Sequence, residues 1–173
     1  MRRDKGFSLI ELLIVVAIIL IIAGIAIPSL ISAKIAADDG SAVGSLRTIN
    51  TAQISYASAY PATGYASTVA ALGPAAASGC TTPSSANACL LDWVVSNSTT
   101  AANAKSGYYF GMSAVASNGV NVGYTVGGAP ASFNRTGVRG FCSNEDGVLR
   151  VIPALNGPPV TGNVACAAYT ALQ

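Results

Sequence analysis

The sequence contains no histidine, and only 9% of its 173 residues are charged. An average soluble domain carries about 25% charged residues, so the composition argues against an ordinary soluble enzyme. The lack of histidine excludes mechanisms that need an imidazole base and argues against a zinc or copper enzyme. A net charge of +2, without a stripe of Lys and Arg, argues against nucleic-acid binding. At 51% hydrophobic residues, the chain is also too apolar for intrinsic disorder.

The few charges are unevenly distributed, with residues 2–5 all charged and Glu11 the only charge in residues 7–27. As a helix, that apolar stretch spans about 31 Å, the thickness of the hydrocarbon core of a bilayer. Positive charge before an apolar span predicts a cytoplasmic N-terminus and an exported body. An ordinary cleavable signal peptide is the alternative, because small residues at 24–26 suit its cleavage.

Two features argue against that alternative. A carboxylate within an apolar membrane helix costs of order 2–3 kcal/mol at the bilayer centre, so Glu11 has no reason to be in a disposable signal. The apolar periodicity also continues past the cleavage region, with polar residues including Ser45 on the other face. The periodic apolar positions are Ile31, Ile35, Ala42, Leu46, Ile49, Tyr56 and Tyr60. This pattern predicts one helix from about Ser8 to Tyr60 that ends before Pro61.

Two weak points are expected in this helix. Pro28 lacks a backbone donor and its ring opposes the carbonyl of Gly24, which is itself a poor helix former. Gly24 to Pro28 is therefore either a kink that neighbouring groups satisfy or a functional weak point. The Asp-Asp-Gly sequence at 38–40 predicts a second, milder interruption.

Residues 5–16, KGFSLIELLIVV, resemble the class III signal sequence of a type IV prepilin. Members of that family have a basic leader ending in Gly, then Phe, then Glu at the fifth mature position, as at Gly6, Phe7 and Glu11 here. Pro28 also matches a helix-breaking proline of the family. Residues 42–52 resemble the end of the pilin helix, whereas the rest of the chain resembles the family less closely.

The resemblance implies that a prepilin peptidase removes residues 1–6 by cleaving after Gly6 and then methylates the amine of Phe7. Residues 7–30 would form a transmembrane helix that later becomes the filament core, and residues 31–60 an amphipathic helix half. The subunit would lie in membrane lipid, meet the inner-membrane assembly machinery and polymerise with itself. Glu11 could then pair with the Phe7 amine of a neighbouring subunit, which would set the register of assembly.

Residues 61–173 are expected to form an α+β head, with an antiparallel sheet packed on the amphipathic helix half. A short helix is possible at 68–72, and residues 88–96 form a strand or short helix that would bury Trp93. Asp146-Gly147 predicts a hairpin turn. The expected strands cover residues 107–115, 119–126, 138–142 and 148–152.

Four cysteines in an exported head predict two disulfides. Three pairings are possible. The sequential one, Cys80–Cys89 and Cys142–Cys166, is expected because each pair brackets a loop-rich segment. The resemblance adds that the last pair would attach the C-terminal loop to the sheet. The cysteine spacing does not favour zinc.

The sequence therefore predicts a structural subunit of a type IV pilus, serving adhesion, motility or DNA uptake. It would be a single-pass inner-membrane precursor and then part of an extracellular filament. A type II secretion pseudopilin is the alternative, and a secreted or anchored protein with an ordinary signal peptide is a third. No catalytic residues, cofactor or metal site are expected, since Glu145 and Asp146 are too few ligands for calcium.

Overall fold

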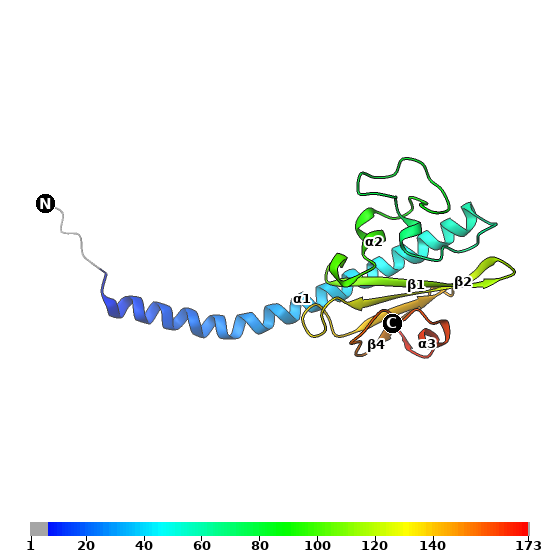
Figure 1. Ribbon diagram of the computed structural model, residues 1–173. Coiled ribbons are helices and arrows are strands. Elements are labelled where there is room, and N and C mark those ends of the chain that lie inside the picture. Colours follow the sequence, from blue (N-terminus) through cyan, green and yellow to red (C-terminus); the bar gives the residue numbers. More distant parts are fainter. Residues whose placement is uncertain (1–6, 173) are drawn as a thin grey trace. The chain divides into compact units, whose positions relative to one another are not determined.

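The computed structural model describes residues 7–172 of the chain. They divide into two compact units, one up to Lys34 and one from Ile35 onward. Helix α1, Leu9–Ala59, contributes to both units (Figure 1) and ends two residues before Pro61. The predicted long helix is confirmed to within one residue at each end.

Helix α1 is continuous through Gly24, Pro28 and residues 38–40. The expected interruption at 38–40 is wrong. Asp39 faces the head and is buried there, while the backbone around Gly40 stays helical. Tertiary contacts of the Asp39 side chain thus outweigh the weak helical propensity of this tripeptide.

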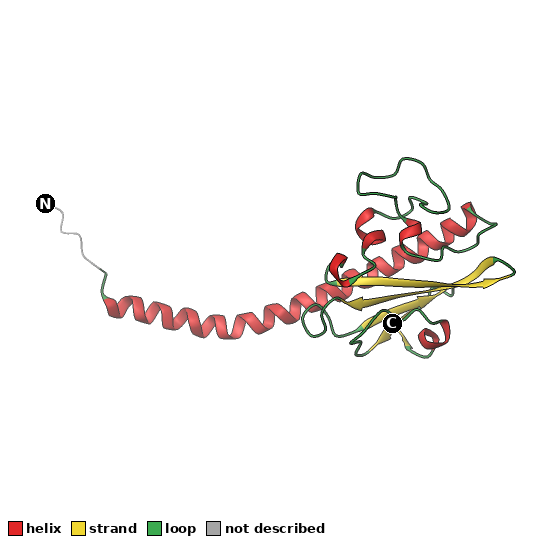
Figure 2. Ribbon diagram, in the orientation of Figure 1, coloured by secondary structure: helices red, strands yellow, loops and turns green. Residues whose placement is uncertain are grey.

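The head contains five antiparallel strands in the order of the chain (Figure 2). The predicted antiparallel sheet is confirmed, with the four expected strands and one further strand at the C-terminal end of the head. Each strand pairs with its neighbours in sequence, so the sheet is a meander with β1 and β5 at its edges. The strands are β1 Tyr108–Ser117, β2 Val120–Pro130, β3 Gly140–Asn144, β4 Leu149–Ile152 and β5 Thr170–Ala171. The expected turn between β3 and β4 is present, with Gly147 at φ 70°.

One face of the sheet packs on the part of α1 that belongs to the head. Buried α1 residues form a core with aromatic residues of the first three strands, and this confirms the predicted packing of helix on sheet. The central members are Leu46, Ile49, Tyr56, Tyr108, Phe110, Tyr124 and Phe141. Ser45, expected on the polar face, is buried. Its hydroxyl donates to the Ser41 carbonyl and accepts from Lys105, so burial does not leave it without hydrogen-bond partners.

The opposite face of the sheet is covered by the C-terminal segment and helix α3, Asn163–Ala167 (Figure 1). Cys142, Ile152 and Cys166 form a second small core there. A Cβ on Gly127 would lie 2.3 Å from the carbonyl oxygen of Val160, so the segment crosses β2 where only glycine fits. Every residue of β3 is buried because both of its faces are covered.

Short helices complete the head. They are η1 Ala70–Leu72, α2 Trp93–Asn97 and η2 Ala101–Asn103. The side chain of Asp92 caps α2 by accepting from the amide of Val95. The expected burial of Trp93 is wrong: it is only partly buried, and Leu91 and Val95 fill the core instead.

Candidate functional site

The unit formed by residues 7–34, here called the apolar segment, exposes all of its large side chains. Their exposed fractions range from 46% for Val16 to 80% for Leu9. Among the described residues, α1 is the one helix that is long and apolar enough to cross a membrane. An apolar surface this continuous is unfavourable in water and needs lipid or protein against it. The apolar segment is therefore a binding surface.

Glu11 lies at the first turn of this segment. The amide of Ser8 donates a hydrogen bond to Glu11 Oε2 at 2.9 Å. Ser8 precedes the first helical residue, Leu9, so Glu11 occupies the third helical position and completes half of a capping box. Its negative charge also lies at the positive end of the helix dipole. The Ser-x-x-Glu spacing at 8–11 is the sequence signal for this cap, a role that Glu11 has in addition to being a charge in an apolar helix.

Phe7 is 76% exposed and directly precedes the Ser8 amide that Glu11 binds. Gly6, the expected cleavage position, lies outside the described residues. If cleavage produced an amine at Phe7, that amine would be one residue away from the Ser8 amide, which already donates to the Glu11 carboxylate. This arrangement offers Glu11 a partner within its own chain as well as the neighbouring subunit expected from the sequence.

Gly24 and Pro28 are both exposed within the continuous helix. No heavy atom lies within 4 Å of a Cβ built on Gly24, outside its own helical turn. The hydroxyl of Ser32 donates to the Pro28 carbonyl at 3.1 Å, a local bond typical of serine in apolar helices. Because Pro28 has no backbone N–H, it cannot donate the helical hydrogen bond that the carbonyl of Gly24 would otherwise accept.

Within the head, a buried carboxylate joins α1 to the sheet. Asp39 is 5% exposed, accepts a hydrogen bond from the Tyr108 hydroxyl and pairs with Arg139 at 2.6 Å. Burial and this bond to Asp39 raise the pKa of the Tyr108 phenol above its ordinary value. The sequence gives no sign of this contact, because Asp39 and Arg139 are 100 positions apart.

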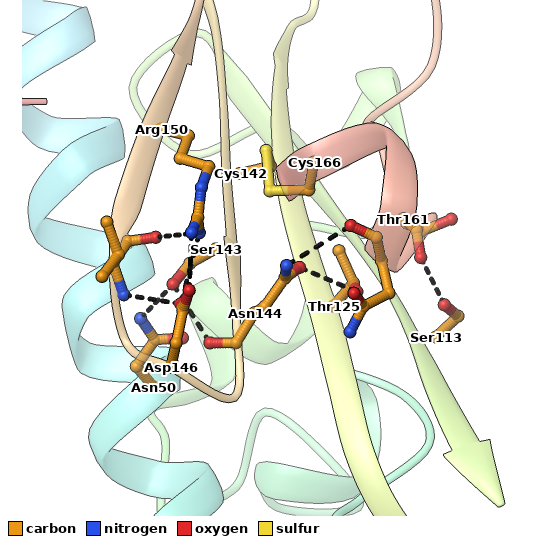
Figure 3. The surroundings of a disulfide bond; sticks show 12 residues. Asn50, Ser113, Thr125, Cys142, Ser143, Asn144, Asp146, Arg150, Thr161 and Cys166 are labelled. Carbon is orange, nitrogen blue, oxygen red and sulfur yellow. Dashed lines mark hydrogen bonds and ion pairs between the residues drawn. A yellow bond between two sulfur atoms is a disulfide. The ribbon is translucent and has the colours of Figure 1, made fainter. Parts of the chain in front are cut away.

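Two buried amides make further connections from α1. Asn50 donates to the Ser143 hydroxyl at 2.9 Å (Figure 3). It also accepts from the Tyr124 hydroxyl at 3.1 Å. Gln53 bonds both the amide and the carbonyl of Ala66, so it holds the chain that follows the helix. These polar groups are fully satisfied, and they fix the rotation of α1 on the sheet better than apolar contacts alone would.

Both disulfides join the pairs expected from sequential order. Cys142 on β3 and Cys166 on α3 are fully buried and attach the C-terminal segment to the sheet (Figure 3). The Cys80–Cys89 bridge instead closes a surface loop. Residues 81–86 of that loop are exposed, and its far end is attached by backbone hydrogen bonds from Cys89 and Leu90 to η1 and its C-cap.

The turn between β3 and β4 holds the acidic pair. Asp146 bonds Arg150 at 2.6 Å, which lowers the pKa of this carboxyl, and Glu145 accepts from the Asn163 amide. Both carboxylates thus have partners from the protein. Among residues 7–172, no group of three or more His, Cys, Asp or Glu is arranged to hold a metal ion.

Comparison with known families agrees with the geometry of the apolar segment. A model described as the prokaryotic N-terminal methylation motif matches residues 1–27. The N-terminal segment therefore has the motif that its resemblance to type IV prepilins predicts. The resemblance stated from the sequence is thereby confirmed for this part of the chain.

Two pilins are similar to the chain over short regions. The major component of the type IV wide pilus of Thermus thermophilus is 59% identical over 39 residues, which are 22% of this chain and 30% of that protein. The type IV major pilin protein of Myxococcus xanthus is 48% identical over 56 residues, 32% of this chain and 26% of that protein. The chain thus matches less than a third of either pilin. No solved structure matches it significantly.

Proposed function

We propose that this chain is a structural subunit of a type IV pilus that polymerises through its apolar segment into a surface filament. The observation that carries the proposal is the continuous exposed apolar surface of residues 7–34, joined to a folded head that presents no comparable surface. Such a subunit is stored with the segment in lipid. It assembles when the segments of many copies cover one another.

The processing steps follow from the pilin-type N-terminus. A prepilin peptidase cleaves between Gly6 and Phe7 and methylates the new amine. Removal of the leader leaves six positive and six negative side chains in the mature chain, after three cations and one anion are lost from the totals of nine and seven. Electrostatic repulsion between identical copies is weaker for a near-neutral subunit than for a highly charged one, so close packing is easier.

Glu11 acts in assembly through the Phe7 amine of an adjacent subunit. At an effective dielectric constant of 20, an ion pair at 4 Å attracts by about 4 kcal/mol before desolvation is subtracted. Because that desolvation cost is of similar size, the pair sets the axial register more than it adds stability. In the monomer, the Ser8 amide keeps the carboxylate bonded near the end of the helix.

The subunit is an inner-membrane precursor that the pilus assembly machinery moves into an extracellular filament for adhesion, motility or DNA uptake. A type II secretion pseudopilin would have the same N-terminus. The two disulfides and the acidic turn, with both carboxylates bound by protein groups, favour a pilus over a pseudopilus with a calcium loop. An ordinary signal peptide on a secreted protein would not explain the match of residues 1–27 to the methylation motif.

The test is mass spectrometry of filaments sheared from the cell surface, together with electron microscopy of the same fraction. The proposal expects a subunit that begins with N-methylated Phe7 and has both disulfides. A soluble secreted head that begins near Ile27 would contradict it and support the ordinary signal peptide. An uncleaved chain confined to the membrane would contradict it as well.

A further inference from the structure

The two disulfides of the head differ in their access to solvent. Cys142 and Cys166 are fully buried, whereas Cys80 is exposed and Cys89 is half-buried. Thiol–disulfide exchange begins when a thiolate attacks one sulfur of a bridge, so its rate depends on access to that sulfur. A small thiol in solution can therefore reach Cys80, but it cannot reach the second bridge while the head is folded.

Residues 75–83, here called the exposed arm, depend on Cys80 for their attachment to the head. Every residue of the exposed arm is exposed to solvent. Among the described residues, the arm makes one backbone hydrogen bond outside regular elements, and it is internal, from the Gly79 amide to the Ala76 carbonyl. Apart from the chain that enters at the buried Pro74, the disulfide is thus what attaches the arm.

The half of the loop that contains Cys89 is attached by hydrogen bonds instead. The Tyr56 hydroxyl donates to the Ser85 carbonyl at 2.6 Å. The amides of Ala88 and Leu90, on either side of Cys89, donate to carbonyls of η1 at 2.8 and 2.7 Å. These bonds do not depend on the disulfide. When the bridge opens, Cys89 therefore stays in place and the exposed arm moves away.

We propose that Cys80 is a site of reversible modification by low-molecular-weight thiols, and that Cys89 is the thiol that reverses it. The incoming thiolate forms a bond to the Cys80 sulfur, and the bond between Cys80 and Cys89 breaks. The electron pair of that bond leaves with the Cys89 sulfur, which takes a proton from solvent. The products are a mixed disulfide at Cys80 and a free thiol at Cys89, so the number of disulfides is unchanged.

The reverse reaction restores the bridge. The Cys89 thiolate attacks the Cys80 sulfur of the mixed disulfide and expels the small thiol. Because the two cysteines are nine positions apart in one loop, this closure is intramolecular and needs no further reagent. The bridge thus acts as a latch on the exposed arm, which external thiols open while the core of the head stays folded. This property goes beyond polymerisation and needs only the head.

Exposure of the purified full-length chain, in detergent, to a mixture of reduced and oxidised glutathione tests the exchange. Samples are quenched with acid, alkylated with N-ethylmaleimide and mapped by mass spectrometry without reduction. The Cys80–Cys89 bridge is expected to open at least on the order of a hundredfold faster than Cys142–Cys166, which must wait for the head to open. In denaturant, where both bridges are accessible, the two rates are expected to agree within about fivefold.

The earliest samples show which sulfur is attacked. Glutathione is expected on Cys80 and N-ethylmaleimide on Cys89, with about tenfold less of the opposite arrangement, because Cys80 is the more exposed of the two. On removal of glutathione before alkylation, the bridge is expected to close again without added oxidant.

Limited digestion with elastase, which cleaves beside small side chains such as those at 75–77, measures release of the exposed arm. A variant with both Cys80→Ser and Cys89→Ser is permanently open, and its arm is expected to be cut on the order of tenfold faster than that of the bridged chain. Tyr56→Phe is the matched control. It removes the hydrogen bond to Ser85 but keeps the bridge, so the arm is expected to stay as resistant as in the unchanged chain.

Three results would each overturn the proposal: equal opening of the two bridges in the folded chain, glutathione mainly on Cys89, or an arm that elastase cuts no faster in the open variant. Peptide mapping of Cys142–Cys166 in every sample verifies that the head is folded. None of these measurements uses filaments, so failure of this proposal and failure of pilus assembly are distinguishable.

Discussion

The amide of Ser8 donates a hydrogen bond to Oε2 of Glu11, so one carboxylate serves the start of the helix as well as its proposed role in assembly. These roles depend on different properties of the side chain. The cap needs an acceptor oxygen, which a glutamine amide also has. The pairing with an amine needs negative charge.

Replacement of Glu11 separates the two roles. Glu11→Gln is expected to keep the first turn of α1 but to lower the ratio of subunit in sheared filaments to subunit in membranes. Glu11→Ala is expected to lower that ratio as much and also to fray the first turn, at a cost of about 0.3–1.5 kcal/mol of helix stability. Quantitative immunoblotting of the two fractions measures the ratio, and hydrogen exchange at the first turn measures the fraying.

The matched control is Glu145→Gln, which makes the same change at an exposed carboxylate in the head. It is expected to leave the filament ratio unchanged. Cleavage after Gly6 is measured in the same samples. A normal filament yield from Glu11→Gln would show that the charge has no role in assembly and that Glu11 is only a cap.

The two disulfides are expected to differ in their effect on stability. Replacing Cys142 and Cys166 with alanine should lower the free energy of unfolding of the head by roughly 3–5 kcal/mol, because the loop is longer and the sulfurs fill a core. Replacing Cys80 and Cys89 should cost about 2–3 kcal/mol, mainly from loop closure. Denaturant unfolding in detergent, followed by the fluorescence of Trp93, measures both. Equal losses would contradict a packing role for the buried bridge.

The sequence predicts the helix and the first four strands because each leaves a local pattern, whereas the two-residue strand β5 leaves none. The disulfide pairs follow from sequential order around loop-rich segments. Apolar spacing defines α1, alternation defines β2, and Asp146-Gly147 marks a turn. The contacts of Asp39, Asn50 and Gln53 leave no such pattern, since each joins a helical position to a distant partner. Helix propensity alone predicts an interruption at Asp39, because it takes no account of the ion pair with Arg139.

The candidate site divides in the same way. Residues 5–16 predict the pilin-type N-terminus by motif, and the exposure of the apolar segment follows from its composition. The cap at Glu11 could have been predicted from the Ser-x-x-Glu spacing.

The buried carboxylate of Asp39 is expected to stabilise the docking of α1 on the sheet. Asp39→Ala leaves the Tyr108 hydroxyl and Arg139 without their acceptor and should lower the free energy of unfolding by about 1–3 kcal/mol. Asp38→Ala, at the adjacent and less buried carboxylate, should cost less. Denaturant unfolding of the full chain measures the difference, and equal losses from the two variants would contradict the role given to Asp39.

Alkaline pH is expected to destabilise the head through its buried phenols. Burial raises the pKa values of Tyr108 and Tyr124 above their ordinary value, so the folded head resists ionisation that the unfolded chain undergoes. Their contribution to stability is complete below the unfolded pKa of about 10 and is lost as pH rises above it. Tyr124→Phe should weaken this dependence, because it removes one of the two buried phenols. Thermal unfolding in detergent between pH 8 and 11 tests the difference.

The loop closed by Cys80 and Cys89 has a consequence for how such a surface can change. Its ends are fixed by the bridge and by backbone bonds to η1 and its C-cap, while residues 81–86 contribute no buried side chain. The backbone carbonyl of Ser85 accepts from the hydroxyl of the buried Tyr56, so substitutions throughout the loop, and short insertions before Ser85, leave the core as it is. In a polymer, one altered loop is repeated on every copy, so a foreign peptide placed between the two cysteines would be displayed at regular intervals along the fibre.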